Sequence, residues 1–315
     1  KSVVPNAPLP KLIERQPACQ PEDVPGWNKL FSWQKEGAIA LAKKTKKFLW
    51  FAPGLGKTGS FLAGARLYGA KKTLILTRAL GVGSFLRDAK WCGGLNVVRV
   101  KGRGPDFKIE AAYEIADALL INYEVLDGRL SSLGPLKFDL MICDEAHFLR
   151  AHKYKDYAAW VKAAEALSAS IVSGGGDVWQ GTATPVADRR RDLFRQLKIA
   201  FPDQRFGTSW QFMHYFCRAR LNQYGGLDTT GSSNTEILHD RLSHYVLKRT
   251  KAQSIHELPA LRRERLRIEC DISKLRHPKG VENAIAEAAA IKLEDGVELI
   301  IDRLKGPGKV VAVVN

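Results

Sequence analysis

The feature that most constrains the fold is a glycine-rich turn at residues 54–58, placed between two apolar runs. Residues 47–52 are typical of a buried strand, and residues 59–65 are typical of the start of a helix. In a strand–loop–helix unit of this kind, loop amides and the helix N-terminus converge on an anion. The turn therefore predicts a phosphate-binding loop. Its members are Pro53, Gly54, Leu55, Gly56, Lys57, Thr58 and Gly59.

Each residue type in the loop suits a nucleoside triphosphate. Gly54 and Gly56 allow the backbone to approach the phosphates, and Lys57 neutralises the β and γ phosphates. The Thr58 hydroxyl is the expected protein ligand for Mg²⁺. A glycine turn with an incidental Lys-Thr pair is the alternative, which the strand–helix context disfavours.

Two carboxylates, Asp144 and Glu145, follow the apolar run that ends at Cys143. Ligands bind at the carboxyl ends of strands in parallel sheets. We expect Asp144 to engage Mg²⁺ through water, and Glu145 to orient and activate the attacking water. The predicted catalytic residues are Glu145, Asp144 and Lys57, and the predicted cofactors are ATP and Mg²⁺. A solvated acidic turn is the alternative.

Four further polar residues are weaker candidates. His147 either links the nucleotide site to a neighbouring motif or is a polar residue at a helix start. Thr182 and Thr184 close a strand and could bond toward the acidic pair, although the same residues fit ordinary turn chemistry. Gln34 has the donor and acceptor needed to read an adenine edge. On the residues alone, a surface glutamine in a first helical turn is the favoured interpretation.

The formal charge of +16 favours a polyanionic partner, most simply nucleic acid, over an ordinary basic enzyme. Arg189, Arg190 and Arg191 are the best candidates for phosphate-backbone contacts, although a charge run is often only a solvated face. The five cysteines are scattered singly, and no run of 18 apolar residues would cross a membrane. Residues 1–10 have no apolar stretch of signal-peptide type, so we expect an intracellular protein, cytoplasmic or nuclear.

Short apolar blocks alternate with helical patterns, which predicts a doubly wound parallel α/β sheet. Helices are expected at 34–44, 59–68 and 156–169. Strands are expected at 48–52, 73–77, 96–100, 118–122, 138–143 and 178–182.

Changes in composition predict five parts. Six prolines mark residues 1–28 as a surface arm, and 29–187 form the nucleotide-binding lobe. Residues 188–275 are expected to form a helical protrusion without parallel-strand alternation. An Ala-rich helical linker at 276–308 precedes a fresh buried strand at 309–315, where a second α/β unit begins.

Together these motifs resemble the superfamily-two helicases and, in more detail, the Swi/Snf-type DNA translocases. Residues 30–34 are similar to that family's glutamine motif, 119–124 to its strand followed by Tyr-Glu, and 138–150 to its acidic box. Residues 73–91 and 245–259 are similar to two further family segments. The resemblance covers residues 30–268 and leans toward the annealing, fork-remodelling or phage branches.

The resemblance implies a RecA-like lobe of an ATP-dependent motor on double-stranded or forked DNA. It implies that Gln34 contacts adenine and that His147, Thr182 and Thr184 couple the site to DNA. The family's second RecA-like lobe supplies an arginine finger, worth roughly 10³–10⁵ in rate, so we expect this chain alone to hydrolyse ATP poorly. Departures are Thr182 to Pro185, where the family more often has Thr-Gly-Thr-Pro, and residues 51–53, which replace an acidic lead-in.

Two alternatives stay open. A DEAH-box RNA helicase shares the spelling of the acidic box, although residues 76–79 lack that class's usual Pro-Arg-Arg segment. A DNA-binding module that uses ATP only as a structural ligand is the second, and the intact Lys57, Asp144 and Glu145 argue against it.

Overall fold

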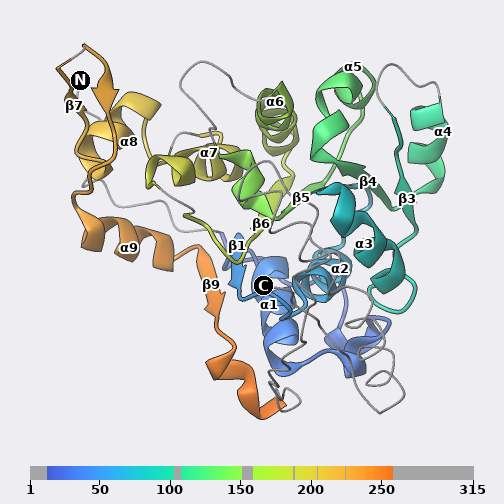
Figure 1. Cartoon of the computed structure of the whole chain (residues 1–315). Coiled ribbons are helices and arrows are strands. Elements are labelled where there is room, and N and C mark those ends of the chain that lie inside the picture. The colour runs from blue at the N-terminus through green and yellow to red at the C-terminus, as the bar shows by residue number, and fades with distance from the viewer. Residues whose placement is uncertain are drawn as a thin grey trace, which may run out of the picture. The chain divides into compact units, whose positions relative to one another are not determined.

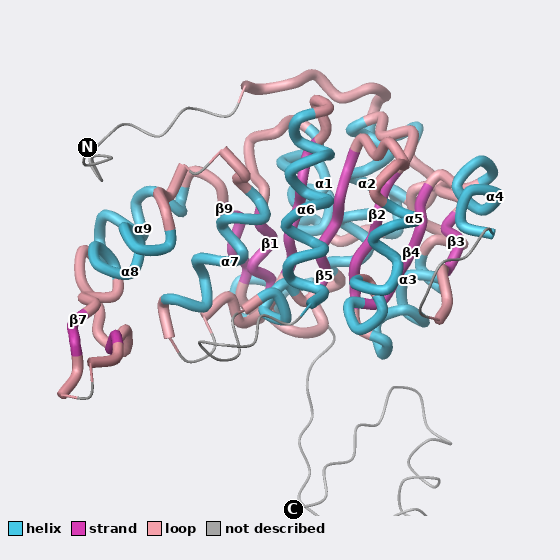
Figure 2. Tube along the Cα trace, turned by 90° about the horizontal axis from the view of Figure 1, so that it is seen from above, coloured by secondary structure: helices cyan, strands magenta, loops and turns pink. Residues whose placement is uncertain are grey.

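The computed structural model describes residues 13–102, 108–150, 159–186, 189–203, 205–223 and 225–257. Seven parallel strands form one sheet with helices on both faces (Figures 1 and 2). The strand order is β3-β4-β2-β5-β6-β1-β9. The expected doubly wound α/β fold is therefore confirmed. The strands are β1 Phe48–Phe51, β2 Thr73–Thr77, β3 Val97–Arg99, β4 Ala118–Asn122, β5 Leu140–Asp144, β6 Asp177–Gly181 and β9 Val246–Arg249, and a separate hairpin pairs β7 Arg220–Leu221 with β8 Leu227–Asp228.

Nine α-helices lie in the described part of the chain. They are α1 Ser32–Ala42, α2 Lys57–Tyr68, α3 Val82–Asp88, α4 Lys108–Ile115, α5 Leu130–Leu133, α6 Ala159–Ser173, α7 Arg191–Ala200, α8 Ser209–Phe216 and α9 Thr235–Ser243. Short 3₁₀ turns occupy Pro21–Asp23, Trp27–Lys29, Ala79–Gly81, Tyr123–Val125, Asp127–Arg129, Ala146–Leu149 and Ala252–Glu257. None of these helices is long and apolar enough to cross a membrane.

The two faces of the sheet carry separate apolar cores. Side chains alternate along a strand, so Ile75 packs with α1 and α2 while its neighbour Leu74 packs with α6. Ile142 and Met141 divide in the same way. Figure 1 shows α1 and α2 on one side of the strands and α5 and α6 on the other. Burial on both faces explains why these strands are continuous apolar runs.

Strand β9 was missed by the sequence analysis, which placed it inside a helical protrusion. It pairs in parallel with β1 over four residues, from Phe48 with Val246 to Phe51 with Arg249. Only Leu247 of its four residues is buried, because β9 is one of the two edge strands of the described sheet. The segment after residue 187 thus returns to the main sheet, and the boundary at that residue stays a prediction.

Helices α7, α8 and α9 share a third apolar cluster. Phe194, Phe212 and Phe216 pack there with Leu242 of α9 and Tyr245, which precedes β9. Figure 2 shows α8, α9 and β7 beyond the β9 edge of the sheet. The predicted linker at 276–308 and the strand at 309–315 lie outside the described residues, as do residues 1–12 of the arm.

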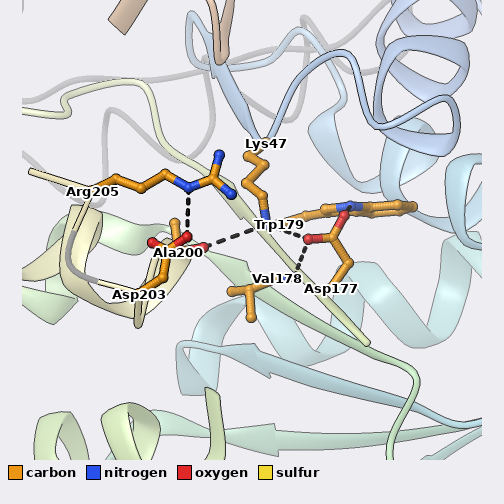
Figure 3. Close-up of polar contacts among 7 residues, drawn as sticks. All are labelled: Lys47, Asp177, Val178, Trp179, Ala200, Asp203 and Arg205. Atoms are coloured by element: carbon orange, nitrogen blue, oxygen red, sulfur yellow. Dashed lines mark hydrogen bonds and ion pairs between the residues drawn. The ribbon is translucent and has the colours of Figure 1, made fainter. Parts of the chain in front are cut away.

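A buried ion pair lies at the amino ends of two strands (Figure 3). Lys47, directly before β1, pairs with Asp177, the first residue of β6. Asp177 also accepts hydrogen bonds from the Val178 amide at 2.8 Å and from Trp179 Nε1 at 3.2 Å. Lys47 lies 5.2 Å from the Phe201 ring centroid. This pair lies at the amino ends of the strands, whereas the phosphate loop lies at their carboxyl ends.

Candidate active site

The predicted phosphate loop joins the carboxyl end of β1 to the N-terminus of α2. Gly54 and Gly56 both adopt left-handed backbone angles, with φ of 84° and 70°. Glycine is required at Gly56 for a second reason, because a Cβ there would lie 2.1 Å from Gln34 Nε2. Helix α2 begins directly after this residue, at Lys57, and Thr58 is half-buried in its first turn. The sequence therefore builds the strand–loop–helix unit that an anion site requires.

Two side chains of α1 reach the loop. Trp33 Nε1 donates to the Leu55 carbonyl oxygen at 2.9 Å, and Gln34 Nε2 donates to the Gly56 carbonyl oxygen at 2.9 Å. Gln34 Oε1 accepts from the Phe31 amide, also at 2.9 Å. Both ends of the Gln34 amide thus bind backbone groups of this chain. The predicted contact of Gln34 with adenine stays a prediction.

Asp144 ends β5 and is almost fully buried. Thr77, the last residue of the neighbouring strand β2, donates its hydroxyl to Asp144 Oδ2 at 3.1 Å. Burial raises the pKa of the Asp144 carboxyl to about 6, the charge of Glu145 adds to the rise, and Lys57 opposes it. Lys57 therefore compensates the ionised Asp144 carboxylate only in part, because burial is the larger effect.

Glu145 follows in a left-handed conformation, with φ of 49°, which is uncommon for a residue with a Cβ. Its carboxylate lies 3.7 Å from Lys57 Nζ and 3.3 Å from His147 Nδ1. The hydrogen bond with His147 lowers the pKa of Glu145, burial opposes this, and the charge of Lys57 lowers it further. The pKa values of the two adjacent carboxyls are therefore shifted in opposite directions, upward for Asp144 and downward for Glu145. Glu145 is thus ionised and able to accept a proton.

His147 connects the acidic pair to the end of β6. Its Nδ1 lies 3.0 Å from Thr182 Oγ1 as well as 3.3 Å from Glu145. Thr182 is buried, and its hydroxyl accepts from the Thr184 amide at 3.1 Å. The Thr184 side chain is exposed. Thr182 therefore contacts the site through His147, whereas Thr184 contributes its backbone.

The three predicted DNA-contacting arginines have different surroundings. Arg190 donates to the Ser233 carbonyl at 3.1 Å and to Thr235 Oγ1 at 2.8 Å. Arg191 donates to Thr229 Oγ1 at 3.2 Å. Both guanidinium groups thus tie the N-terminal end of α7 to the first residue of α9 and to the segment before it. The Arg189 side chain is exposed, so it is the member of the run best placed for an external phosphate.

Three residues near the site were not singled out from the sequence. Besides Thr77, the Tyr123 hydroxyl donates to the Asp144 carbonyl oxygen at 2.7 Å and is fully buried. The Arg78 guanidinium lies 4.1 Å from the centroid of Phe148, next to His147. Thr77 ends β2, the neighbour of β5, and Tyr123 follows β4, the next strand beyond β2. Parallel strands bring residues at their carboxyl ends together. That rule was the available signal.

The sheet, loop and acidic pair define a RecA-like P-loop lobe. Comparison with known families is more specific: residues 49–279 match the SNF2-related domain. This chain belongs to that family.

Individual relatives agree with the family assignment. The chain is 28% identical over 257 residues to the mouse "DNA annealing helicase and endonuclease ZRANB3", with 76% of this chain and 22% of the relative covered. It is 25% identical over 246 residues to the Drosophila melanogaster "SWI/SNF-related matrix-associated actin-dependent regulator of chromatin subfamily A-like protein 1", with 75% and 30% covered. The chain thus spans less than a third of these relatives.

A solved structure supports the fold. The "Sulfolobus solfataricus SWI2/SNF2 ATPase core in complex with dsDNA" superposes with a TM-score of 0.56 at 20% identity. The match covers 73% of this chain and 47% of that chain.

Proposed function

We propose that this chain is an ATP-hydrolysing motor lobe of a DNA translocase. The observation that carries the proposal is the convergence of Lys57, Asp144 and Glu145 at one edge of the sheet, with Lys57 Nζ 3.7 Å from the Glu145 carboxylate. A cation for phosphates, a buried carboxylate and an ionised base are the groups that phosphoryl transfer to water requires. Membership of the SNF2-related family supports the same reaction.

The residues fit ATP and Mg²⁺. Neither the Gly56 nor the Lys57 amide donates a hydrogen bond within the described part of the chain, so both can serve phosphate oxygens. Bound Mg²⁺ would neutralise charge on the β and γ phosphates, and Thr58 and Asp144 are the side chains that would hold it. Lys57 then neutralises the phosphates, while Glu145 orients a water and accepts its proton. His147 holds Glu145 in its ionised form.

The proposed partner is double-stranded or forked DNA. The formal charge of +16 favours a polyanion, and the exposed Arg189 is the proposed contact. The names of the two relatives concern DNA and chromatin, which disfavours the DEAH-box RNA helicase. Thr182 joins β6 to His147 and Glu145, so we propose it as the route by which DNA affects hydrolysis.

The test is steady-state ATP turnover with duplex, forked and single-stranded DNA and with RNA. It is run on the chain alone and on the chain fused to a second motor lobe. We expect slow turnover alone, faster turnover in the fusion, and stimulation by duplex or forked DNA. Stimulation by RNA alone would identify an RNA helicase instead. Turnover that no nucleic acid stimulates would contradict the translocase, and no turnover at all would leave a DNA-binding module.

A further inference from the structure

The glycines of the phosphate loop leave the direction of its peptide groups poorly restrained. Gly54 and Gly56 flank Leu55, and both adopt left-handed angles. Glycine adopts many backbone conformations at little cost, so the peptide groups beside it can rotate. A rotated peptide would point a carbonyl oxygen, rather than an amide, at a bound phosphate. The loop therefore needs something that fixes the direction of its peptide groups.

Two neighbouring residues of α1 supply that restraint. Trp33 Nε1 holds the Leu55 carbonyl oxygen and Gln34 Nε2 holds the Gly56 carbonyl oxygen, each at 2.9 Å. The peptide bonds are trans, so the N–H of each peptide points opposite to its carbonyl. Fixing the Leu55 and Gly56 oxygens toward α1 thus directs the amides of Gly56 and Lys57 away from α1. These two amides have no acceptor in the described residues.

The restraint is itself rigid. Trp33 is buried, and its ring stacks on Phe31 with centroids 4.6 Å apart and planes 8° from parallel. Gln34 is buried, and its Oε1 is held by the Phe31 amide. Leu55 is also buried, so its carbonyl oxygen would lose its hydrogen bond away from bulk water if the indole N–H were removed. Helices α1 and α2 pack side by side (Figure 1), which keeps the Trp33 and Gln34 donors of α1 close to the loop that precedes α2.

We propose that Trp33 is a positioning residue of the nucleotide site, and that with Gln34 it presets the loop amides for the phosphates before any nucleotide binds. The inference rests on the proposed function of the loop. It assigns Gln34 a role toward the phosphates, whereas the adenine contact expected from the sequence concerns the base. The two roles predict different ligand selectivity, so they can be separated experimentally.

The test is calorimetric binding of Mg-ATP, Mg-GTP and Mg-tripolyphosphate to the chain and to three variants. Trp33→Phe keeps an aromatic ring and removes only the N–H. Gln34→Glu keeps the acceptor for Phe31 and removes the donor. Trp50→Phe in β1 is the matched control, because Trp50 Nε1 is buried without a hydrogen-bond partner among the described residues. Thermal melting of each variant reports any loss of folding.

We expect Trp33→Phe and Gln34→Glu to lower the affinity for all three ligands by the same factor, about fivefold, since each variant loses one hydrogen bond to the loop. Trp50→Phe should bind like the parent chain. Binding by Trp33→Phe that equals the parent's would overturn the proposal, as would a loss confined to ATP. If the parent chain binds none of the ligands, the proposed function itself fails. If Trp33→Phe does not fold, Gln34→Glu decides by the same criterion.

Discussion

The ammonium group of Lys57 and the carboxylate of Glu145 face each other across 3.7 Å at the carboxyl edge of the sheet. Lys57 belongs to the first turn of α2, and Glu145 follows the end of β5, so the pair joins the phosphate loop to the acidic box. Such a pair holds the base ionised near the position where a γ-phosphate would meet Lys57.

Glu145→Gln should separate binding from hydrolysis. Removing a general base costs roughly 10²–10⁴ in rate, so kcat for ATP should fall by about that factor. The affinity for Mg-ATP should be unchanged or higher, because Lys57 loses a competing anion. Turnover assays and calorimetry on the same preparation measure both quantities. An unchanged kcat would show that Glu145 is not the base.

Asp144→Asn should stabilise the protein when no Mg²⁺ is added. The pKa of Asp144 is raised to about 6 in the folded chain, so the folded state binds this proton more tightly than the unfolded state. The resulting contribution to stability is complete below about pH 4 and is lost as pH rises through about 6. At pH 7 the ionised carboxylate then costs on the order of 2 kcal/mol, which the variant avoids.

Urea unfolding of Asp144→Asn and the parent chain at pH 4 and pH 7 measures this difference. We expect the variant to be more stable at pH 7 and close to the parent at pH 4. A variant less stable than the parent at pH 7 would contradict the raised pKa.

Lys47→Met should destabilise the fold without affecting the nucleotide site. The change leaves Asp177 as an unpaired buried charge, which costs about 3–5 kcal/mol. Adding Asp177→Asn removes that charge and should recover part of the loss, although its single amide oxygen can accept from only one of the two donors, the Val178 amide or Trp179 Nε1. Denaturant unfolding of the single and double variants measures whether their losses of stability are non-additive. Additive losses would argue against an interaction between Lys47 and Asp177. Affinity for Mg-ATP should stay constant in every variant that folds, because the pair is at the opposite edge.

Arg189→Ala should affect DNA binding, whereas Arg190→Ala should affect stability. Arg189 is exposed, so its removal should weaken duplex DNA binding and reduce the slope of log K against log salt by about one, with an unchanged melting temperature. Arg190 bonds Ser233 and Thr235, so its removal should lower the melting temperature instead. Equal DNA binding by Arg189→Ala and the parent would exclude Arg189 as a contact.

The sequence predicted six of the seven strands. Five of them are largely buried, and a strand buried on both faces is an apolar run. The sixth, β3, lies at the other end of the sheet and has no buried residue, but its two valines still gave an apolar signal. Strand β9 leaves no such signal. It has four residues, and Lys248 and Arg249 occupy half of them because an edge strand needs little apolar surface. Its place in the sheet comes from pairing with β1, which only the folded chain shows.

The sequence predicted those site residues that belong to local motifs. It did not predict contacts that depend on which strands lie next to each other in the sheet. Lys57, Asp144 and Glu145 follow from strand ends and a glycine turn. The contact of Thr77 with Asp144 depends on which strands are neighbours. The run Arg189 to Arg191 shows a further limit, because sequence does not tell which charged side chains bond their own chain.

The central claim is that the edge of the sheet carrying Lys57 binds a nucleoside triphosphate. The most direct test is calorimetric titration of Mg-ATP into the chain, into Lys57→Ala and into Lys43→Ala, which removes an exposed lysine just after α1. Loss of charge-assisted hydrogen bonds should weaken binding by Lys57→Ala about 10–100-fold, with Lys43→Ala unchanged. Equal affinity of the parent and Lys57→Ala would contradict the account.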